Sequence, residues 1–225
     1  MSVKERLTRD QMAAIAAQHL EPGWVVNLGF GMPAFVSNFI YPEMSIILHA
    51  EHGLLGYGPV APPELEDLDT TNATGDFVTL LPGAAVMHHA DSFAMIRRGL
   101  IDCVILGAYE VDSEGSFANW KVSVDLPRGL GDALGGAMDL AQCSKQVYIM
   151  MEHTTADGRP RLVKQLSLPV TAIRVVKLVV TDLAVLAMTD KGFELQAHAP
   201  GYTVEEIQAL TEIPLLVSPD LRPAV

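Results

Sequence analysis

The chain has 225 residues, of which 49% are hydrophobic and 19% charged, and its formal net charge is −12. A chain of this length and apolar content can bury a full core, which excludes a largely disordered protein. The negative charge argues against nucleic-acid binding, which needs clustered Lys and Arg. No apolar run approaches the roughly 18 residues that a membrane helix needs.

The first residues of the chain indicate the cellular compartment. The first ten residues mix both charge signs and lack an apolar core, so we expect neither a signal nor a transit peptide and a cytoplasmic protein. In that compartment Cys103 and Cys143 are expected to be free thiols. We expect residues 1–225 to form a single domain, with the excess apolar surface in a subunit interface.

Helix and strand signals alternate along the first two thirds of the chain. This alternation predicts an α/β fold with an open, mostly parallel sheet and helices on both faces. A capping box from Thr8 to Gln11 predicts a first helix, with its apolar residues on one face. Strands are expected at 24–28, 45–50, 77–81, 102–107 and 146–151, and a helix at 91–98 that Asp91 caps.

A turn with glycines at Gly29 and Gly31 follows the first expected strand and leads into a second helix, with Pro33 near its first position. The turn could bind an anion, but it lacks the third glycine of a dinucleotide fingerprint. We therefore interpret it as a structural turn.

The last third of the chain changes character. Short strands are expected at 175–181, 183–189 and 193–197, and residues 190–192 predict a C-terminal β-hairpin between the last two. Thr203 and Glu206 form a second capping box, which predicts a closing helix.

Glu51 is the most informative residue. It stands at the carboxyl end of the apolar strand expected at 45–50, where open α/β sheets place their ligands. A glycine-rich turn is expected to follow, in which Gly53, Gly56 and Gly58 let the backbone approach a ligand closely. This arrangement suits a carboxylate nucleophile.

Histidines near this position raise the question of a metal. His49 and His52 flank Glu51, and His88 and His89 are adjacent, but neither pair has the spacing that puts two imidazoles on one helical face. Polar histidines at the edge of the sheet are the simpler interpretation.

Three other patterns bear on function. Ser92 and Ser123 have no His and Asp partners placed by the sequence, and no Gly-x-Ser-x-Gly elbow supports a serine hydrolase. Arg97 and Arg98 end a predicted helix, which favours helix termination, with recognition of a carboxylate or phosphate as the alternative. Gly135-Gly136 precedes a helix-compatible run, where backbone N–H groups could donate to an oxyanion.

Taken together, these segments resemble the second (β) subunit of the two-subunit 3-oxoacid CoA-transferases. The resemblance covers nearly the whole chain and implies the fold of family I CoA-transferases. The stretch around Trp120 and residues 88–93 are most similar to the 3-oxoadipate branch. The matching segments are 26–33, 51–56, 80–84, 91–97, 106–108, 118–120, 135–140, 150–153, 168–171 and 181–185.

The resemblance implies a ping-pong reaction that moves CoA from an acyl-CoA, such as succinyl-CoA, to 3-oxoadipate or acetoacetate. Glu51 would be the nucleophile and would carry CoA as a glutamyl thioester, with Gly136 and Gly135 as oxyanion donors. No metal or redox cofactor is implied, because CoA is a substrate. The CoA-transferase α subunit is the implied partner, in a heterodimer or heterotetramer. The implied substrate-binding residues are His52, Gly53, Arg97, Arg98 and Asn119.

The chain departs from the family pattern near the site. Ala50 and His52 stand where Ser-Glu-Asn-Gly is common, and residues 97–100 replace the usual Arg-Gly-Gly-His. Ala133 and Leu134 replace a segment that often carries glycine. A protonated His52 would favour the ionised form of Glu51, whereas a neutral one could assist attack by water. We hypothesise that Arg98 faces the acyl pocket and holds a second carboxylate.

Two other functions stay open at this point. A thioester hydrolase on the same scaffold would use Glu51 as a base instead of a nucleophile. A non-catalytic subunit that binds a small molecule is the second alternative, because one fold serves many functions.

Overall fold

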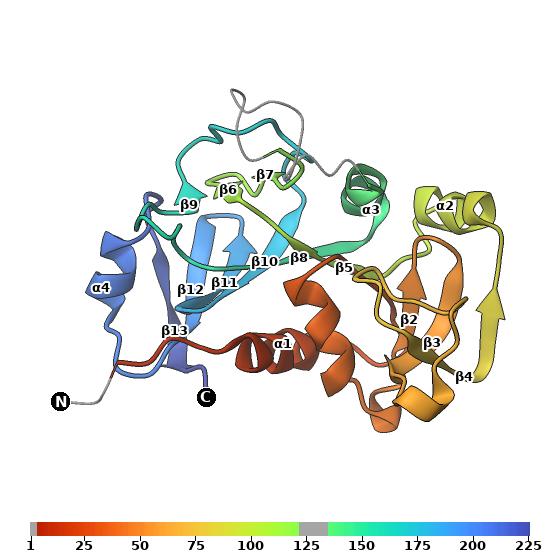
Figure 1. The fold of residues 1–225 in the computed structure, drawn as a ribbon. Coiled ribbons are helices and arrows are strands. Elements are labelled where there is room, and N and C mark those ends of the chain that lie inside the picture. Colours follow the sequence, from red (N-terminus) through yellow and green to blue (C-terminus); the bar gives the residue numbers. More distant parts are fainter. Residues whose placement is uncertain (1–3, 122–134) are drawn as a thin grey trace.

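A ten-stranded sheet organises the chain (Figure 1) in the computed structural model, which describes residues 4–121 and 135–225. The strand order is β13-β12-β11-β10-β8-β5-β1-β2-β3-β4, and the five strands from β10 to β2 run parallel. Antiparallel pairs flank this centre, which confirms the expected open, mostly parallel sheet. The strands are β1 Val25–Leu28, β2 Ile47–Ala50, β3 Leu54–Val60, β4 Val78–Val86, β5 Cys103–Gly107, β8 Gln146–Met151, β10 Val176–Thr181, β11 Ala184–Thr189, β12 Gly192–His198 and β13 Leu216–Pro223.

Helices cover both faces of the sheet, as expected (Figure 1). The α1 helix and the 3-10 helix η1 pack on one face, and α2 and α3 on the other. The helices are α1 Arg9–Gln18, α2 His89–Arg97, α3 Ala137–Cys143 and α4 Val204–Ala209, with 3-10 helices η1 Met32–Phe39, η2 Pro42–Met44 and η3 Pro63–Leu65.

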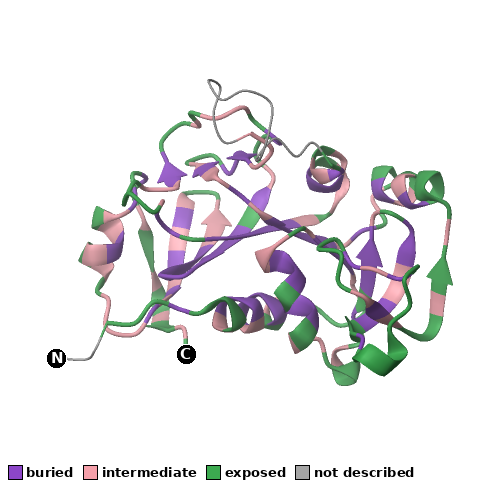
Figure 2. Ribbon diagram, viewed as in Figure 1, coloured by how far each residue is buried: buried purple, intermediate pink, exposed green. Residues whose placement is uncertain are grey.

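The central strands lie between two separate cores, and successive residues of a strand belong to one core and then the other. Figure 2 shows that β5 and β8 are therefore buried along most of their length. In β5, Cys103 and Ile105 join the core beneath α1, whereas Val104 and Leu106 join the core beneath α2 and α3. This period of two is the pleat of a strand that is covered on both sides. The face that a residue occupies therefore follows from its position in the strand.

Local signals in the sequence account for several of these elements. Thr8 and Gln11 form the capping box of α1, and Thr203 and Glu206 form that of α4. The hairpin through residues 190–192 joins β11 to β12, because Thr189 pairs with Gly192. These three predictions are confirmed.

Other local predictions are wrong in detail. The helix with Pro33 near its start is a 3-10 helix, and Asp91 does not cap α2. His88 has an extended backbone, and its Nδ1 accepts a hydrogen bond from the Ala90 N–H at 3.1 Å, so α2 begins two residues before Asp91. Asp91 lies instead in the first turn, where its charge complements the helix dipole.

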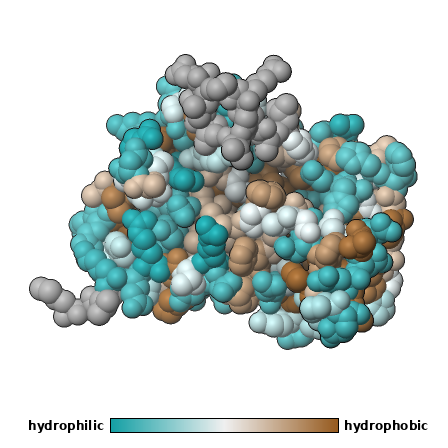
Figure 3. Space-filling model, viewed as in Figure 1, coloured by the Kyte–Doolittle hydropathy of each residue, from teal (hydrophilic) through white to brown (hydrophobic). Residues whose placement is uncertain are grey.

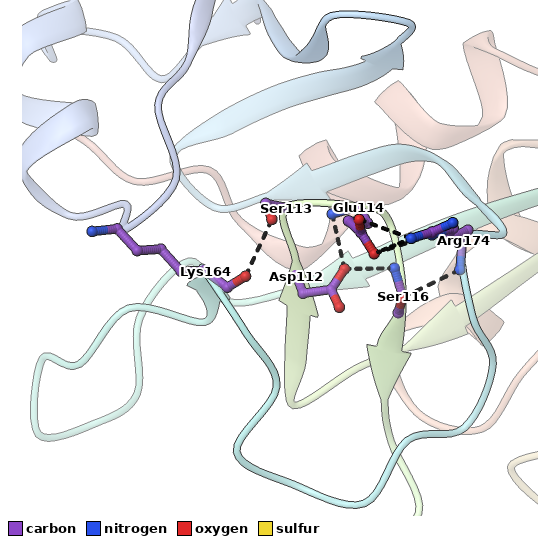
Figure 4. A network of polar contacts seen from close by, with 6 residues as sticks. All are labelled: Asp112, Ser113, Glu114, Ser116, Lys164 and Arg174. Atoms are coloured by element: carbon purple, nitrogen blue, oxygen red, sulfur yellow. Dashed lines mark hydrogen bonds and ion pairs between the residues drawn. The ribbon is translucent and has the colours of Figure 1, made fainter.

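A small three-stranded sheet, which the sequence did not predict, packs above the main sheet (Figure 1). It consists of β6 Glu110–Asp112, β7 Phe117–Ala118 and β9 Leu162–Val163. Polar contacts fix its turn (Figure 4): Oδ1 of Asp112 accepts from the backbone N–H groups of Glu114 and Ser116, and Arg174 binds the Glu114 carboxylate. The turn from β6 to β7 is thereby tied to residue 174.

The two cysteines lie apart as free thiols, Cys103 buried in β5 and Cys143 half-buried at the end of α3. Burial raises the pKa of the Cys103 thiol well above its ordinary value. As for membrane contact, no helix of residues 4–121 and 135–225 has both the length and the apolar character needed to cross a bilayer.

Candidate active site

Glu51 directly follows the last residue of β2, at the carboxyl end of a parallel strand, as the sequence predicted. Ala50 belongs to the core beneath α1, so the next residue in the alternation is directed to the opposite face, where α2 and α3 lie. The Glu51 side chain is half-buried and stays accessible to solvent. A carboxylate in this position is held by the sheet and open to a ligand.

The glycines after Glu51 make room for β4. Gly53 has φ +126°, and a Cβ there would stand 2.2 Å from the carbonyl oxygen of Met87. A Cβ on Gly56 would stand 3.2 Å from Cα of Ala84, and one on Gly58 would stand 2.6 Å from the hydroxyl oxygen of Thr79, both in β4. The expected glycine-rich turn is therefore wrong beyond residue 53: residues 54–60 form β3, because β4 pairs with them and the glycines allow its close approach.

Gly136 contacts Glu51 directly. Its backbone N–H donates to Oε1 of Glu51 at an N···O distance of 3.3 Å. A Cβ on Gly136 would lie 2.2 Å from Oε2 of Glu51 and 2.8 Å from Cζ of Phe93, so glycine alone leaves these two side chains where they are. Gly135 is exposed, and a Cβ there would meet Oε1 at an ordinary 3.9 Å.

The structure thus brings Glu51 and the glycine pair together, with Gly136 as the hydrogen-bond donor. Gly136 directly precedes α3, so the donor to Glu51 is the backbone N–H at the start of this helix. The predicted departures at Ala133 and Leu134, and the serine candidate Ser123, lie outside the described residues.

Phe93 and Arg97 of α2 form one wall of the site. The Phe93 ring stacks on His89 at a centroid distance of 4.6 Å, and the Arg97 guanidinium lies 5.6 Å from the centre of the same ring. Arg97 also binds Asp139 of α3 through two hydrogen bonds of 2.8 and 3.3 Å. Arg97 therefore links α2 to α3, and no spacing in the sequence indicated Asp139 as its partner.

Three other predicted binding residues lie on different elements of the fold. His52 is exposed in the turn beside Glu51, and Arg98 is exposed at the end of α2. Asn119 is half-buried after β7, where its Oδ1 accepts from the Thr171 hydroxyl at 2.8 Å. Within residues 4–121 and 135–225, none of these three side chains hydrogen-bonds to Glu51, so their substrate-binding roles stay predictions.

Behind Glu51, three polar side chains are buried between β1, β2 and α2. Asn27 Nδ2 lies 3.0 Å from His49 Nδ1, and His49 Nε2 lies 2.9 Å from the Ser92 hydroxyl. All three are at most 2% exposed. Burial lowers the pKa of His49 to about 4, with a smaller contribution from the charge of His52. His49 is therefore a neutral core residue and not a histidine at a polar edge, and Ser92 has a histidine partner that the sequence did not place.

A metal centre is not formed by these histidines. His88 and His89 are exposed at the start of α2. In the part of the chain that the structure describes, no three His, Cys, Asp or Glu side chains are grouped to hold a metal ion.

Two surface hollows lie away from Glu51. One of about 270 Å³ is lined by residues of α1, β11, β12 and β13, including His19 and Arg222. The other, of about 180 Å³, lies beside the small sheet and includes Arg159 and Arg161. Neither hollow is lined by Glu51 or Gly136.

Comparison with known proteins relates the chain to coenzyme A transferases. The sequence model of the coenzyme A transferase family matches residues 9–210. The chain is 41% identical over 216 residues to the B subunit of 3-oxoadipate CoA-transferase from Pseudomonas putida, covering 96% of this chain and 100% of that protein. It is 40% identical over 210 residues to the B subunit of a probable succinyl-CoA:3-ketoacid coenzyme A transferase from Bacillus subtilis, covering 93% and 95%.

Among solved structures, an acyl-CoA transferase of Escherichia coli O157:H7 is similar with a TM-score of 0.72 at 21% identity. The match covers 96% of this chain but 43% of the other, so this chain spans less than half of that protein. At this level of identity the similarity concerns the fold.

Proposed function

The chain belongs to the coenzyme A transferase family, and from this premise we propose that it is the β subunit of a 3-oxoacid CoA-transferase, with residues 1–225 as one subunit domain. The proposed donor is succinyl-CoA and the proposed acceptor is 3-oxoadipate or acetoacetate. The names of the two relatives support these substrates. The observation that carries the proposal is the hydrogen bond from Gly136 to the Glu51 carboxylate at the end of β2.

In the proposed first half-reaction, a Glu51 oxygen attacks the thioester carbonyl of the acyl-CoA. The C–S bond breaks, which gives an acyl-glutamyl anhydride and CoA thiolate. The thiolate then attacks the glutamyl carbonyl and displaces the acid as its carboxylate, leaving CoA on Glu51 as a thioester. A 3-oxoacid carboxylate reverses both steps and departs as its CoA ester.

Gly136 suits the step in which thiolate attacks Glu51. That attack puts negative charge on the glutamyl oxygen that Glu51 retains. In the resting site the Gly136 N–H already contacts Oε1, so Oε1 is the proposed retained oxygen and Oε2 the attacking one. A donor that is fixed in place before reaction stabilises developing charge without reorganisation.

The proposed chemistry needs no metal or redox cofactor, since CoA is a substrate and the reaction only exchanges acyl groups. It does need water to be excluded, because water would hydrolyse the anhydride or the thioester. Glu51 is only half-buried and keeps contact with solvent, which favours closure by another polypeptide.

That polypeptide is the proposed α subunit, in a heterodimer or heterotetramer. Two observations support it besides the subunit names of the relatives. Apolar residues gather on the side of the molecule that holds β2, β3 and β4 (Figure 3), including the exposed Leu80, Leu81 and Val86 of β4. Cations on a partner would also offset the net charge of −12, which disfavours binding of anionic CoA by this chain alone.

Intact-mass spectrometry of the chain purified with its α subunit tests the proposal. After mixing with succinyl-CoA, this chain should gain the mass of CoA less one water, and Glu51→Ala should gain nothing. Steady release of CoA without an acceptor acid and without an adduct would indicate a hydrolase. Neither adduct nor CoA release with succinyl-CoA or acetoacetyl-CoA would indicate a binding subunit.

A further inference from the structure

A buried chain of hydrogen bonds connects the strand that holds Glu51 to the helix that walls its site. Asn27 and His49 are paired across the parallel strands β1 and β2, and their neighbours in each strand face the α1 core. Both side chains therefore point to the α2 side, where His49 meets the Ser92 hydroxyl at 2.9 Å.

The hydrogen positions in this chain of bonds are determined by its chemistry. Asn27 Nδ2 lies 3.1 Å from the backbone oxygen of His49, which only accepts, so this end of the Asn27 amide is the NH₂ group. The same NH₂ donates to Nδ1 of His49 at 3.0 Å. A neutral imidazole with an accepting Nδ1 carries its proton on Nε2, so His49 donates to Ser92.

Two members of this hydrogen-bond chain, His49 and Ser92, lie close in sequence to residues of the proposed active site. His49 stands two residues before Glu51, on the same face of the sheet. Ser92 is adjacent to Phe93, whose ring Cζ lies 2.8 Å from the position of a Gly136 Cβ. The bond between His49 and Ser92 therefore sets the distance between the strand that holds Glu51 and the helix whose Phe93 bounds the space around it.

We propose that His49 is a positioning residue: by donating from Nε2 to Ser92 it holds α2 against β2 and keeps Glu51 aligned with the Gly136 N–H. The inference rests on the proposed role of Glu51 as the residue that carries CoA. At 0% exposure, neither His49 nor Ser92 touches substrate, so their effect passes through the geometry of Glu51. A displacement of about 1 Å in a reacting group can lower a rate by about a hundredfold.

A second buried histidine provides a matched control. His153 is 0% exposed, contacts the Thr181 and Thr211 hydroxyls at 2.9 and 2.8 Å, and burial lowers its pKa to about 4. It follows β8, which is three strands from β2 in the sheet. Thr211→Val thus removes a comparable buried histidine contact far from Glu51.

The test uses the complex with the α subunit and succinyl-CoA as donor. The rate of adduct formation on Glu51, the KM for succinyl-CoA and the thermal midpoint are measured for Ser92→Ala and Thr211→Val. Both variants are expected to lower the midpoint. Only Ser92→Ala is expected to slow adduct formation, by about tenfold at saturating donor, with KM within about twofold.

Two substitutions of His49 separate its hydrogen bonds. His49→Gln places an amide where Nε2 stood and keeps a donor for Ser92, whereas His49→Asn reaches only as far as Nδ1. We expect His49→Gln to retain most of the rate and His49→Asn to lose about tenfold, even where their midpoints agree.

Equal rate losses in Ser92→Ala and Thr211→Val, or equal rates in the two His49 variants, would overturn the inference while leaving the role of Glu51 intact. A wild-type complex that forms no adduct would overturn the proposed function, and this inference with it.

Discussion

The backbone N–H of Gly136 donates to Oε1 of Glu51 across 85 positions of sequence. Two elements meet to make this contact: β2 ends just before Glu51, and α3 begins just after Gly136. A main-chain N–H thus orients the carboxylate, so a substitution other than proline does not remove the donor itself. The absence of a Cβ at Gly136 is what leaves space for the carboxylate.

Gly136→Ala is expected to abolish most of the transferase activity while the protein stays folded. The new Cβ would stand 2.2 Å from Oε2 of Glu51, and the flexible end of Glu51 can move away at little cost in stability. Moving it breaks the alignment, and the loss of an oxyanion donor costs about a hundredfold or more in kcat. Turnover and the thermal midpoint measure the two effects.

Gly135→Ala is the matched control, because its Cβ would lie at 3.9 Å from the same carboxylate. Its loss should be at least about tenfold smaller than that of Gly136→Ala. Similar losses of activity in both variants would show that the backbone conformation of the glycine pair matters, and not the space that Gly136 leaves beside Glu51.

Gly53→Ala is expected to unfold the β3–β4 end of the sheet. The residue has φ +126°, and a Cβ would stand 2.2 Å from a backbone oxygen of Met87 that cannot move without breaking the pairing of β3 and β4. We expect a loss of more than about 3 kcal/mol in the free energy of unfolding, measured by urea denaturation.

Gly23→Ala is the control that measures the cost of a positive φ without a steric clash. Gly23 has φ +86° with nothing within 4 Å of its Cβ position. This substitution should therefore cost about 1 kcal/mol. Equal costs at Gly53 and Gly23 would rule out the contact with Met87 as the cause.

The sequence predicted the fold where the signal was local. Capping boxes at Thr8 and Thr203 each placed a helix start to within a residue. Prediction failed where pairing decides the structure: β3 was taken for a turn because of its glycines, and no strand was predicted over β13, which contains Pro219 and Pro223. As the last strand of the sheet, β13 tolerates a proline that a central strand would not.

The site was predictable only in part for a similar reason. The position of Glu51 followed from one strand and its end, and the glycine pair was associated with it by family resemblance. The bond between His49 and Ser92 spans 43 positions and depends on α2 packing over β2. No spacing in the sequence indicates such a contact, so the sequence placed no partner for Ser92.

Arg98→Ala is expected to lower kcat/KM for 3-oxoadipate by about tenfold more than for acetoacetate. Arg98 is exposed at the end of α2, whereas Arg97 is bound to Asp139. A charge-assisted bond to the second carboxylate is worth about 1.5–3 kcal/mol, and acetoacetate has no such group. Steady-state kinetics with the two acids measure the difference.

Arg97→Ala is the comparison variant. It breaks the link between α2 and α3, so both acids should lose activity to the same extent. If Arg98→Ala also affected the two acids equally, Arg98 would not select for a second carboxylate.

The two buried histidines predict that stability falls as pH decreases from about 7.5 to about 5. His49 and His153 have pKa values of about 4 in the folded chain, against 6.5 as the ordinary value. Between these values the unfolded chain binds protons that the folded chain does not, so acid favours unfolding. Each histidine should remove about 2 kcal/mol from the free energy of unfolding over this range. Urea denaturation at both pH values measures the loss. In His49→Gln the loss should be smaller by about 2 kcal/mol, because glutamine does not titrate. An unchanged pH dependence in this variant would show that folding does not lower the pKa of His49.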